Sequence, residues 1–405
     1  MPGPLTGIRV LDMSRVLAGP SCAQLLGDLG ADVIKVERPG EGDDTRKWGP
    51  PYLKDAQGRD TTESAYYLSA NRAKRSLTLD FTKPTGRDLA RRLIERSDVV
   101  LENYKVGTLA KYALGYAELH AAFPRLVYCS ITGFGQTGPY APRAGYDYLI
   151  QAMGGIMSVT GEPAGEPVKV AVAIADLMTG MYSTVAILAA LRHRDATGEG
   201  QHIDMALLDT QIAWLANLGQ GYLTSGDLPA RLGNAHATVV PYQVFKTADS
   251  HIVLAIGNDG QFRKFCDFAG APALATDPRF ATNPARIRNR GNLIPEMSAL
   301  LARQTSAYWI RELERIGVPC GPINNLAEVF ADPHVQARGM TVDLPHPAAG
   351  GKPTPLIANP IKFSETPISY DRAPPTIGQH TDEILKELLG LSANEIATLR
   401  TDGAI

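Results

Sequence analysis

Asp176 is the residue whose surroundings in the sequence most suggest chemistry. It lies in Val172-Ala-Ile-Ala-Asp-Leu-Met-Thr-Gly180, with apolar neighbours on both sides, at the predicted start of a long apolar helix. A carboxylate there can simply cap the helix, because the amide groups of a helix N-terminus favour a negative charge. The same carboxylate, removed from water, can instead serve as a nucleophile or a base. The residues alone leave both interpretations open.

Basic residues gather next to several predicted strand ends. Asn71-Arg-Ala-Lys-Arg75 precedes the third predicted strand, Lys105 and Lys111 follow the fourth, and Arg143 precedes Gly145-Tyr-Asp147. Ligands of parallel α/β sheets collect at the carboxyl ends of the strands, so these residues together could bind a ligand with several phosphates. Each cluster taken alone is equally consistent with a solvated charged surface.

Two further loops follow predicted strands. The small-residue loop Ser14-Arg-Val-Leu-Ala-Gly-Pro20 opens a helix and could bring backbone amides close to a phosphate, although a tight turn is the simpler interpretation. Glu37 would suit the ribose of a nicotinamide cofactor and the adjacent Arg38 a phosphate, or both could be solvated. No G-x-G-x-x-G fingerprint is present, which argues against a nicotinamide-dependent oxidoreductase.

The elements that would position these residues alternate between strand and helix. Predicted strands occupy 8–11, 33–36, 76–79, 98–101 and 126–131, and predicted helices occupy 22–29, 85–96 and 116–123. Strands separated by helices of this length imply right-handed crossovers and a parallel sheet. The sequence therefore predicts a doubly wound α/β domain at the N-terminal end of the chain.

The pattern changes after this domain. Residues 179–194 and 204–222 are predicted to be long helices, and 239–256 to be two short strands followed by helices to about residue 317, which indicates a smaller α+β domain. Residues 341–375 are rich in proline and are predicted to form an extended crossing segment, because proline cannot donate to a strand ladder. Residues 377–405 return to a helical pattern.

Composition excludes some classes of protein. The 405 residues carry 40 Lys plus Arg and 42 Asp plus Glu, a formal net charge of −2, which gives no support to a nucleic-acid or polybasic membrane binder. No apolar run of about 18 residues appears, so no membrane span is expected. The four cysteines lack metal-site spacing, so no metal is expected and reduced thiols indicate a cytoplasmic protein, or a mitochondrial one if a targeting segment precedes the chain.

Several short motifs occur together, in an order that matches one enzyme family. They are Gly7-Ile-Arg-Val-Leu-Asp12, Leu17-Ala-Gly-Pro20, Gly30-Ala-Asp-Val-Ile-Lys-Val-Glu37, Asn71-x-x-Lys-Arg-Ser76, Glu102-Asn-Tyr104, Gly145-Tyr-Asp147, Ala175-Asp-Leu177, Gly233-Asn-x-His236 and Gly378-Gln-His-Thr-Asp-Glu383. On these motifs the chain resembles the class III CoA-transferases, the formyl-CoA:oxalate CoA-transferase type, over essentially its full length.

A second set of motifs suggests a branch of that family. Val36-Glu-Arg-Pro-Gly40, Tyr128-Cys-Ser-Ile-Thr-Gly133, Val240-Pro-Tyr-Gln-Val-Phe-Lys246 and Gly321-Pro-Ile-Asn-Asn325 are most similar to the enzymes that move CoA from succinyl-CoA to glutarate. The resemblance therefore implies a dicarboxylyl-CoA donor and a free carboxylic acid acceptor, with coenzyme A as the shared co-substrate.

The resemblance also implies a fold. The family has a Rossmann-like large domain built from both chain ends, a smaller domain between them, and an interlocked homodimer. Applied to this sequence, residues 1–200 and 340–405 form the large CoA-binding domain, and residues 225–325 form the small one. Residues 201–224 and 326–339 then link the two.

The family's catalytic aspartate matches Asp176. In the reaction that the resemblance implies, the carboxylate attacks an acyl-CoA thioester and an aspartyl-CoA thioester forms through a mixed anhydride. Covalent catalysis of this kind divides one difficult exchange into easier steps. A site that excludes water would protect the anhydride from hydrolysis.

The remaining site residues follow from the same match. The CoA contacts are expected at Leu17, Ala18, Arg38, Leu79, Asp80, Thr82, Asn103, Tyr104, Lys105, Lys111, Tyr146 and Asp147, to which the basic residue Arg143 is added. Leu17 replaces a glutamine of the oxalate-specific enzymes, Lys111 replaces an arginine, and the glycine-rich loop of those enzymes is missing, which argues against oxalate. A dicarboxylate needs a cation for its distal carboxylate; Arg72 is the first candidate, Arg286 the second, and His236 a further substrate residue.

Three alternatives remain beside CoA transfer. An acyl-CoA racemase or epimerase of the same family would carry a histidine where this chain has Tyr146, so transfer is favoured. A CoA-transferase for another acid, such as oxalate, differs only in the acceptor. A CoA-binding protein without catalytic activity would bind the cofactor and turn nothing over.

Overall fold

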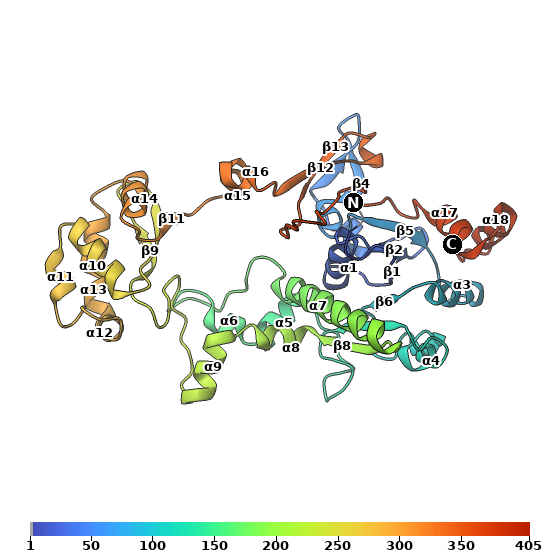
Figure 1. Cartoon of the computed structure of the whole chain (residues 1–405), viewed down its shortest axis with the longest axis horizontal. Coiled ribbons are helices and arrows are strands. Elements are labelled where there is room, and N and C mark those ends of the chain that lie inside the picture. The colour runs from blue at the N-terminus through green and yellow to red at the C-terminus, as the bar shows by residue number, and fades with distance from the viewer. Residues whose placement is uncertain (1–2) are drawn as a thin grey trace. The chain divides into compact units, whose positions relative to one another are not determined.

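The computed structural model describes residues 3–405 as two compact units (Figure 1). The larger unit contains the chain up to Ile156, Lys169–Thr224 and Gln336–Ile405. The smaller unit contains Met157–Val168 and Ser225–Val335. The larger unit is thus assembled from three separate stretches of sequence, including the C-terminal one.

A six-stranded parallel sheet forms the centre of the larger unit. Its strands are β1 (Arg9–Asp12), β2 (Asp32–Glu37), β5 (Lys74–Thr78), β6 (Val99–Glu102), β7 (Val127–Thr132) and β8 (His202–Ala206), in the order β5-β2-β1-β6-β7-β8. The predicted α/β fold with a parallel sheet is confirmed. The strand order reverses between β1 and β6, and the carboxyl ends at such a reversal form the usual ligand crevice of open α/β sheets.

Alternate residues of the strands pack into two separate cores, one on each face of the sheet. Val10, Val33 and Val99 pack with α1 (Ala18–Asp28) and α7 (Ile174–Thr197). Their sequence neighbours, including Leu11, Ile34 and Val100, face the opposite core. The helices that cover this second face are α3 (Pro84–Glu95), α4 (Tyr116–His120), α17 (Thr381–Leu389) and α18 (Ala393–Thr401). The sheet is therefore buried on both faces, as parallel sheets require.

Residues 202–206 differ from the prediction of one helix over 204–222. They pair with β7 as the edge strand β8, and α8 (Leu207–Ala213) and α9 (Ala216–Ser225) follow. The side chains of β8 alternate, with Ile203 and Met205 against the core and Asp204 exposed. This strand is too short, and runs too directly into a helix, for the alternation to stand out in the sequence.

The other elements of the larger unit are short. They are η1 (Asp44–Lys47), β3 (Tyr52–Lys54), β4 (Asp60–Ser64), α2 (Ala65–Ser69), η2 (Ala110–Tyr112), α5 (Asp147–Met153), β12 (Thr341–Pro345), η3 (Pro347–Ala349) and β13 (Pro353–Ile357). β12 and β13 pair antiparallel, so the segment 341–375 is only partly the extended crossing segment that was predicted. Proline is accommodated there because both strands belong to an isolated two-stranded sheet.

The smaller unit has its own core. β9 (Tyr242–Lys246), β10 (His251–Ala255) and β11 (Cys320–Pro322) form an antiparallel sheet in the order β11-β10-β9. The helices are α6 (Ile156–Val159), α10 (Asp259–Phe268), α11 (Pro272–Thr276), α12 (Asn283–Arg288), α13 (Arg290–Leu301), α14 (Ser306–Arg315), α15 (Leu326–Ala331) and α16 (Pro333–Ala337), the first and last of which run past the limits of the unit. The hairpin predicted over 239–256 is present, and β11 was not predicted.

The borders of the units differ from the predicted domain limits. Residues 157–168, assigned to the large domain from the sequence, belong to the smaller unit, where Gly161 accepts a backbone hydrogen bond from Gly233. Residues 201–224, expected as a linking segment, belong to the larger unit because they supply β8 and α8. Both differences arise from pairings between residues far apart in the chain.

α7 is the longest helix, and by length and composition alone it could cross a membrane. Its residues Ala175, Ile187, Ala190 and Leu191 belong to the core that it shares with α1 and the sheet. Gly180 allows α1 and α7 to approach closely, since a Cβ at this position would lie 2.8 Å from the carbonyl oxygen of Ala18. The packing identifies α7 as a core helix of the larger unit.

We expect Gly180→Ala to lower the free energy of unfolding by about 1–3 kcal/mol, because the added methyl group forces α1 away from α7. Gly291→Ala in α13 is the matched control: a Cβ there meets nothing within 4 Å, so the helix propensity of alanine should stabilise by about 0.5–1 kcal/mol. Denaturant unfolding of both variants measures the difference. Equal effects of the two substitutions would contradict the close approach of the helices.

Candidate functional site

Two neighbouring cavities lie at the carboxyl edge of the parallel sheet. The first, the Asp176 cavity, has a volume of about 170 Å³ and is lined by the loop after β1, the ends of β6 and β7, and Asp176. The second, the Arg38 cavity, has a volume of about 270 Å³ and is lined by the end of β2, the residues after it, and the loop after β5. Arg15, Asp44 and Tyr104 line both. The two cavities thus adjoin where the strand order reverses.

The loop after β1 is held in place by Asn103. The Asn103 Oδ1 atom accepts from the Arg15 N–H at 2.9 Å, and its Nδ2 atom donates to the Arg15 carbonyl at 2.7 Å. Val16 has φ of +71°, a conformation that a β-branched residue rarely adopts. This turn brings Leu17 and Ala18, the start of α1, to the wall of the Asp176 cavity.

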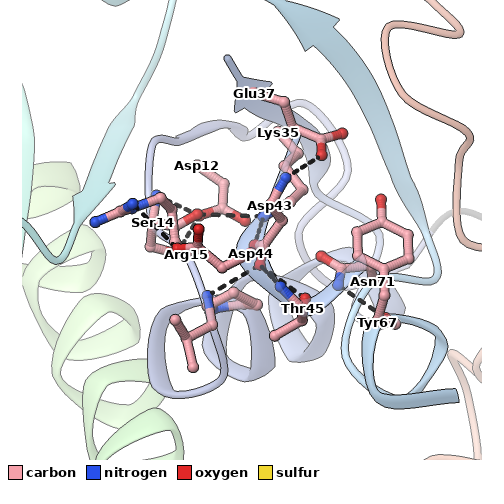
Figure 2. A network of polar contacts seen from close by, with 12 residues as sticks. Asp12, Ser14, Arg15, Lys35, Glu37, Asp43, Asp44, Thr45, Tyr67 and Asn71 are labelled. Atoms are coloured by element: carbon pink, nitrogen blue, oxygen red, sulfur yellow. Dashed lines mark hydrogen bonds and ion pairs between the residues drawn. The ribbon is translucent and has the colours of Figure 1, made fainter. Parts of the chain in front are cut away.

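Buried charges support this loop, and Figure 2 shows Lys35 with Asp43 and Asp12 with Ser14. Lys74 Nζ lies 3.0 Å from Asp12 Oδ2, Lys35 Nζ lies 2.8 Å from Asp43 Oδ2, and none of these four side chains is exposed. Asp12 accepts from the Ser14 backbone and hydroxyl groups, and Lys35 also donates to the Ser14 carbonyl at 3.2 Å. Burial lowers the pKa of Lys74 to about 8, although Asp12 opposes this shift. The loop after β1 is therefore held by hydrogen bonds to two ion pairs that are fully buried.

Glu37 lines the Arg38 cavity but belongs to the same buried layer, where its carboxylate already has partners. Its carboxylate pairs with Arg46 at 2.8 Å and accepts from the Ser76 hydroxyl at 2.7 Å. The guanidinium of Arg46 also stacks on Tyr67, 3.7 Å from the ring centroid. The suggestion that Glu37 could hold the ribose of a nicotinamide cofactor is wrong, because a structural ion pair occupies it.

Asp176 lies in the first turn of α7, and its partly buried carboxylate borders the first cavity. Burial raises the pKa of Asp176 to about 7, and the negative charge of Asp147 adds to the shift. Across residues 3–405 no side chain or amide forms a hydrogen bond or ion pair with this carboxylate. Burial and the same two aspartates also raise the pKa of the Tyr66 hydroxyl to about 12, so that phenol stays protonated beside them. An unpaired carboxylate that ionises near neutral pH is suited to nucleophilic attack.

Asp147 positions the helix that carries Asp176. The capping residue of α7 is Ala173, which has no side chain able to cap. Instead the Asp147 Oδ1 atom, from the first turn of α5, accepts from the Ala175 N–H at 2.8 Å. Its Oδ2 atom accepts from Gln151 Nε2 at 2.8 Å. Asp147 was predicted to contact CoA, but it does not line either cavity and its oxygens are occupied by these donors.

The loop between β7 and α5 is closed at its base by two glycines. A Cβ on Gly133 would lie 2.5 Å from the Cα atom of Gly145, so neither position has room for a side chain. The loop carries Arg143, whose guanidinium lies 5.0 Å from the Phe134 ring centroid and 4.6 Å from that of Tyr140. Arg143 and Tyr146 both line the Asp176 cavity from this side.

Most residues predicted to contact CoA meet at these cavities. Leu17, Ala18, Asn103, Tyr104, Lys105, Arg143 and Tyr146 line the Asp176 cavity, and Arg38, Leu79, Asp80, Thr82 and Tyr104 line the Arg38 cavity. Lys111 is exposed in η2 and lines neither. The sequence motifs therefore locate a continuous site at the switch point, with Lys111 and Asp147 outside its walls.

Arg72 does not offer a free guanidinium to a substrate, contrary to the prediction. It is buried and pairs with both oxygens of Asp28, at 2.9 and 2.5 Å. Its remaining Nη1 atom donates to the Ile357 carbonyl at 2.7 Å. Arg72 therefore links α1 to β13, and each of its three guanidinium nitrogens already donates a hydrogen bond.

The two predicted substrate residues of the smaller unit have different surroundings. Arg286 is fully buried, pairs with Asp259 at 2.7 Å and donates to the Val240 and Phe280 carbonyls, so its assignment as a substrate cation is corrected in the same way. His236 is partly exposed and its Nδ1 atom accepts from the Thr238 N–H at 3.1 Å. The substrate role of His236 stays a prediction.

Sequence reasoning missed charged residues that lie in the site or next to it. Arg15 and Asp44 form an ion pair of 3.1 Å and line both cavities. Glu102, at the end of β6, is buried and accepts from the Tyr104 N–H at 2.8 Å; burial raises the pKa of Glu102 to about 7. Arg15 belongs to the loop 14–20 and Glu102 to the motif Glu102-Asn-Tyr104, but only the fold places them beside the ligand crevice.

Comparisons with known proteins identify the family of the chain. The sequence profile of CoA-transferase family III matches residues 5–381. The succinate–glutarate CoA-transferase of Agrobacterium fabrum is 52% identical, over 95% of this chain and 96% of that protein. The human succinyl-CoA:glutarate CoA-transferase is 43% identical, over 99% and 90%. The crystal structure of a CAIB/BAIF family protein from Brucella suis matches with a TM-score of 0.84 and 50% identity, over 96% of this chain and all of that one.

The fold is that of an α/β protein with two adjoining cavities at the carboxyl edge of its parallel sheet. The chain belongs to CoA-transferase family III.

With Asp176 as the nucleophile, we expect kcat/KM for acyl exchange to rise with pH through about 7, because a carboxyl group attacks only when it is ionised. Asp147→Asn removes the negative charge but keeps an oxygen for the Ala175 N–H, so the pKa of Asp176 should fall and the rising limb should move to lower pH. A shift of roughly one unit or less is expected, since burial is the larger cause of the raised pKa. A limb that stays in place between pH 5 and 9 would exclude coupling between the two aspartates.

Glu102→Gln should raise the free energy of unfolding above about pH 7 and leave it nearly unchanged at pH 4.5. The pKa of Glu102 is raised from 4.5 to about 7 on folding, so the native state loses stability as pH rises from about 4.5 to about 7. The glutamine oxygen can still accept from the Tyr104 N–H, and the gain should grow from near zero at pH 4.5 to about 2–3 kcal/mol at pH 8. Thermal unfolding at both pH values measures it, with Glu118→Gln on the exposed part of α4 as the control.

Proposed function

We propose that this protein transfers CoA from succinyl-CoA to glutarate, with Asp176 as the nucleophile. The observation that carries the proposal is the unpaired Asp176 carboxylate at the switch-point cavity, with a pKa raised to about 7. The choice of acids rests on the names of the Agrobacterium and human relatives, which match nearly the whole chain.

CoA would occupy both cavities. The Arg38 cavity, with Arg38 at its rim and the apolar Leu79 in its wall, suits the nucleotide end of CoA. Arg15, Lys105 and Arg143 surround the Asp176 cavity and would neutralise the diphosphate. Leu17, Ala18 and Ile131, which line the same cavity, would then contact the pantetheine arm that carries the thioester to Asp176.

The covalent steps balance without any external proton. The ionised Asp176 oxygen attacks the thioester carbonyl, the C–S bond breaks, and a mixed anhydride and CoA thiolate result. The thiolate attacks the aspartyl carbonyl, the anhydride C–O bond breaks, and the donor acid leaves as a carboxylate. The acceptor carboxylate then repeats both steps in reverse order on the aspartyl-CoA thioester. The N-terminus of α1, which begins at Leu17 and Ala18, would favour the anionic intermediates.

Asp176→Asn tests the nucleophile. Turnover of succinyl-CoA with glutarate should fall by at least about 1000-fold, because the covalent route is lost, while CoA affinity measured by calorimetry stays within about threefold. Asp209→Asn, an exposed carboxylate in the first turn of α8, is the matched control and should keep full activity. Borohydride reduction during turnover with succinyl-CoA should modify the peptide that contains Asp176. Full activity of Asp176→Asn, or modification of another residue, would refute the assignment.

The acceptor is tested in the same assay. Glutarate, hydroxymethylglutarate, malate, mesaconate, itaconate and oxalate are compared at fixed succinyl-CoA, and glutarate is expected to give the highest kcat/KM. The residue that bears on racemisation is Tyr146, which lines the Asp176 cavity where the racemase branch has a histidine. Exchange of the α-hydrogen of an acyl-CoA in deuterated buffer would favour the racemase instead.

We propose further that the enzyme works as a homodimer, of the interlocked kind that the resemblance implies. The support is a set of exposed apolar side chains on one group of elements of the larger unit: Tyr148 on α5, Met181, Tyr182 and Val185 on α7, Ile212 on α8, and Trp214 directly after it. Exposed apolar groups that gather in this way usually meet a partner. A second copy would cover them.

Val185→Asp should therefore weaken the dimer, because Val185 is 63% exposed and a charge there would be buried without a partner. Light scattering after size exclusion should give a dimer for the wild type and a shift towards monomer or loss of solubility for the variant. Gln57→Asp, on the exposed turn between β3 and β4, controls for added charge and should remain dimeric. A monomeric wild type would refute the proposal.

A further inference from the structure

Gln151 is a fully buried glutamine in the last turn of α5. Its Oε1 atom accepts from the Val170 N–H at 2.8 Å, and its Nε2 atom donates to Asp147 Oδ2 at 2.8 Å. The Nε2 atom also lies within 3.5 Å of the Val170 and Val172 carbonyl oxygens. One side chain thus connects α5 to the segment that leads into α7 and to the carboxylate that caps α7.

The segment from Val170 to Ala175 is held by few other contacts of this kind. Gln151 fixes its beginning through the Val170 N–H, and Asp147 fixes its end through the Ala175 N–H. Asp176 is the next residue. Since Gln151 also donates a hydrogen bond to Asp147, the hydrogen bonds at both ends of the segment depend on the side-chain amide of Gln151.

An amide is the group that this position requires. It accepts one hydrogen bond and donates others at the same time, which neither a carboxylate nor an apolar side chain can do. Within residues 3–405, Asp147 has no arginine, lysine or histidine as an ion-pair partner. The neutral N–H groups of Gln151 and Ala175 are therefore what stabilises its negative charge, close to a second carboxylate.

We propose that Gln151 is a positioning residue of the transfer reaction: it holds the Asp147 carboxylate against the first turn of α7 and so fixes the place and the charge of Asp176. The inference rests on the proposed role of Asp176 as nucleophile. It assigns to Gln151 no contact with the substrate, and its effect passes entirely through Asp147 and residues 170–175.

The charged and titratable groups around this pair come from several elements. Tyr66 on α2 interacts electrostatically with both aspartates, and Asp176 faces Asp147 from α7. Lys169 donates to the Val170 and Ala171 carbonyls, and Asp209 is exposed on α8, which packs against α5. On α5 itself, Tyr148 is exposed to solvent.

Two variants test the inference. Gln151→Met keeps the length of the side chain but removes the donor and the acceptor, so kcat should fall at least tenfold and the rising limb of the pH profile should move to higher pH. Gln151→Glu keeps the acceptor, and its carboxyl group can replace the donor only while protonated. Its activity relative to the wild type should therefore be highest near pH 6 and fall at least tenfold by pH 8.

Gln24→Met is the matched control. Gln24 is also a buried helical glutamine, on α1, and it bonds the Arg72 N–H and the Ser69 carbonyl rather than any residue next to Asp176. This variant should lose stability to a similar extent but keep the wild-type pH profile. CoA affinity and near-UV circular dichroism establish that each variant is folded; if Gln151→Met is not, the pH dependence of Gln151→Glu decides.

The outcomes separate this inference from the proposed function. If Asp176→Asn is inactive while both Gln151 variants follow the wild-type pH profile with unchanged kcat, the inference is wrong and the nucleophile stands. A constant ratio of Gln151→Glu to wild-type activity from pH 6 to 9 is equally contrary to it. If Asp176→Asn retains turnover, the proposed function itself fails.

Discussion

Two lysines without exposed surface, Lys35 and Lys74, are the constraint on which the site depends. An ammonium group removed from water needs a carboxylate and further acceptors, and Asp43, Asp12 and the Ser14 and Pro20 carbonyls supply them. The same carboxylates also hold the Val16, Ser14 and Thr45 amides. The charge pairs therefore fix the backbone path of the loop that forms the wall of both cavities. Removing one partner of such a pair typically costs about 3–5 kcal/mol, because the other charge is left buried.

A second arrangement of charges lies at the end of the crevice that contains Asp176. Asp147 lies in the first turn of α5 and caps α7, so the positive ends of two helices stabilise it. Asp176 lies one residue beyond the capped amide, and nothing in the described part of the chain pairs with it. Asp147 thus accepts a hydrogen bond at each oxygen, whereas the carboxylate of Asp176 is left without a partner among residues 3–405. This division explains how two nearby carboxylates, one on α5 and one on α7, take different roles.

Much of the fold could be predicted because its signals are local. In the run Val33 to Val36, Lys35 is the one charged residue among three that suit a strand buried on both faces, and Asp176 stood out as a lone charge in an apolar segment. β8 was missed because its alternation covers only five residues. Arg72 and Arg143 look alike in the sequence, yet Arg72 is buried and paired with Asp28, whereas Arg143 is exposed and contacts two aromatic rings and the Met153 sulfur. Which arginine is free depends on partners far along the chain, and local pattern does not contain that information.

The covering of the parallel sheet by C-terminal helices has a consequence for folding during protein synthesis. α17 and α18 cover one face of the parallel sheet, Thr381 bonds Thr78, and the Pro375 carbonyl accepts from the buried Arg46. The ribosome makes these residues some 300 positions after the strands that they cover. Leu77 and its neighbours are made some 300 residues before the helices α17 and α18 that bury them. The nascent chain exposes an incomplete apolar face throughout that interval, when chaperones would be most needed.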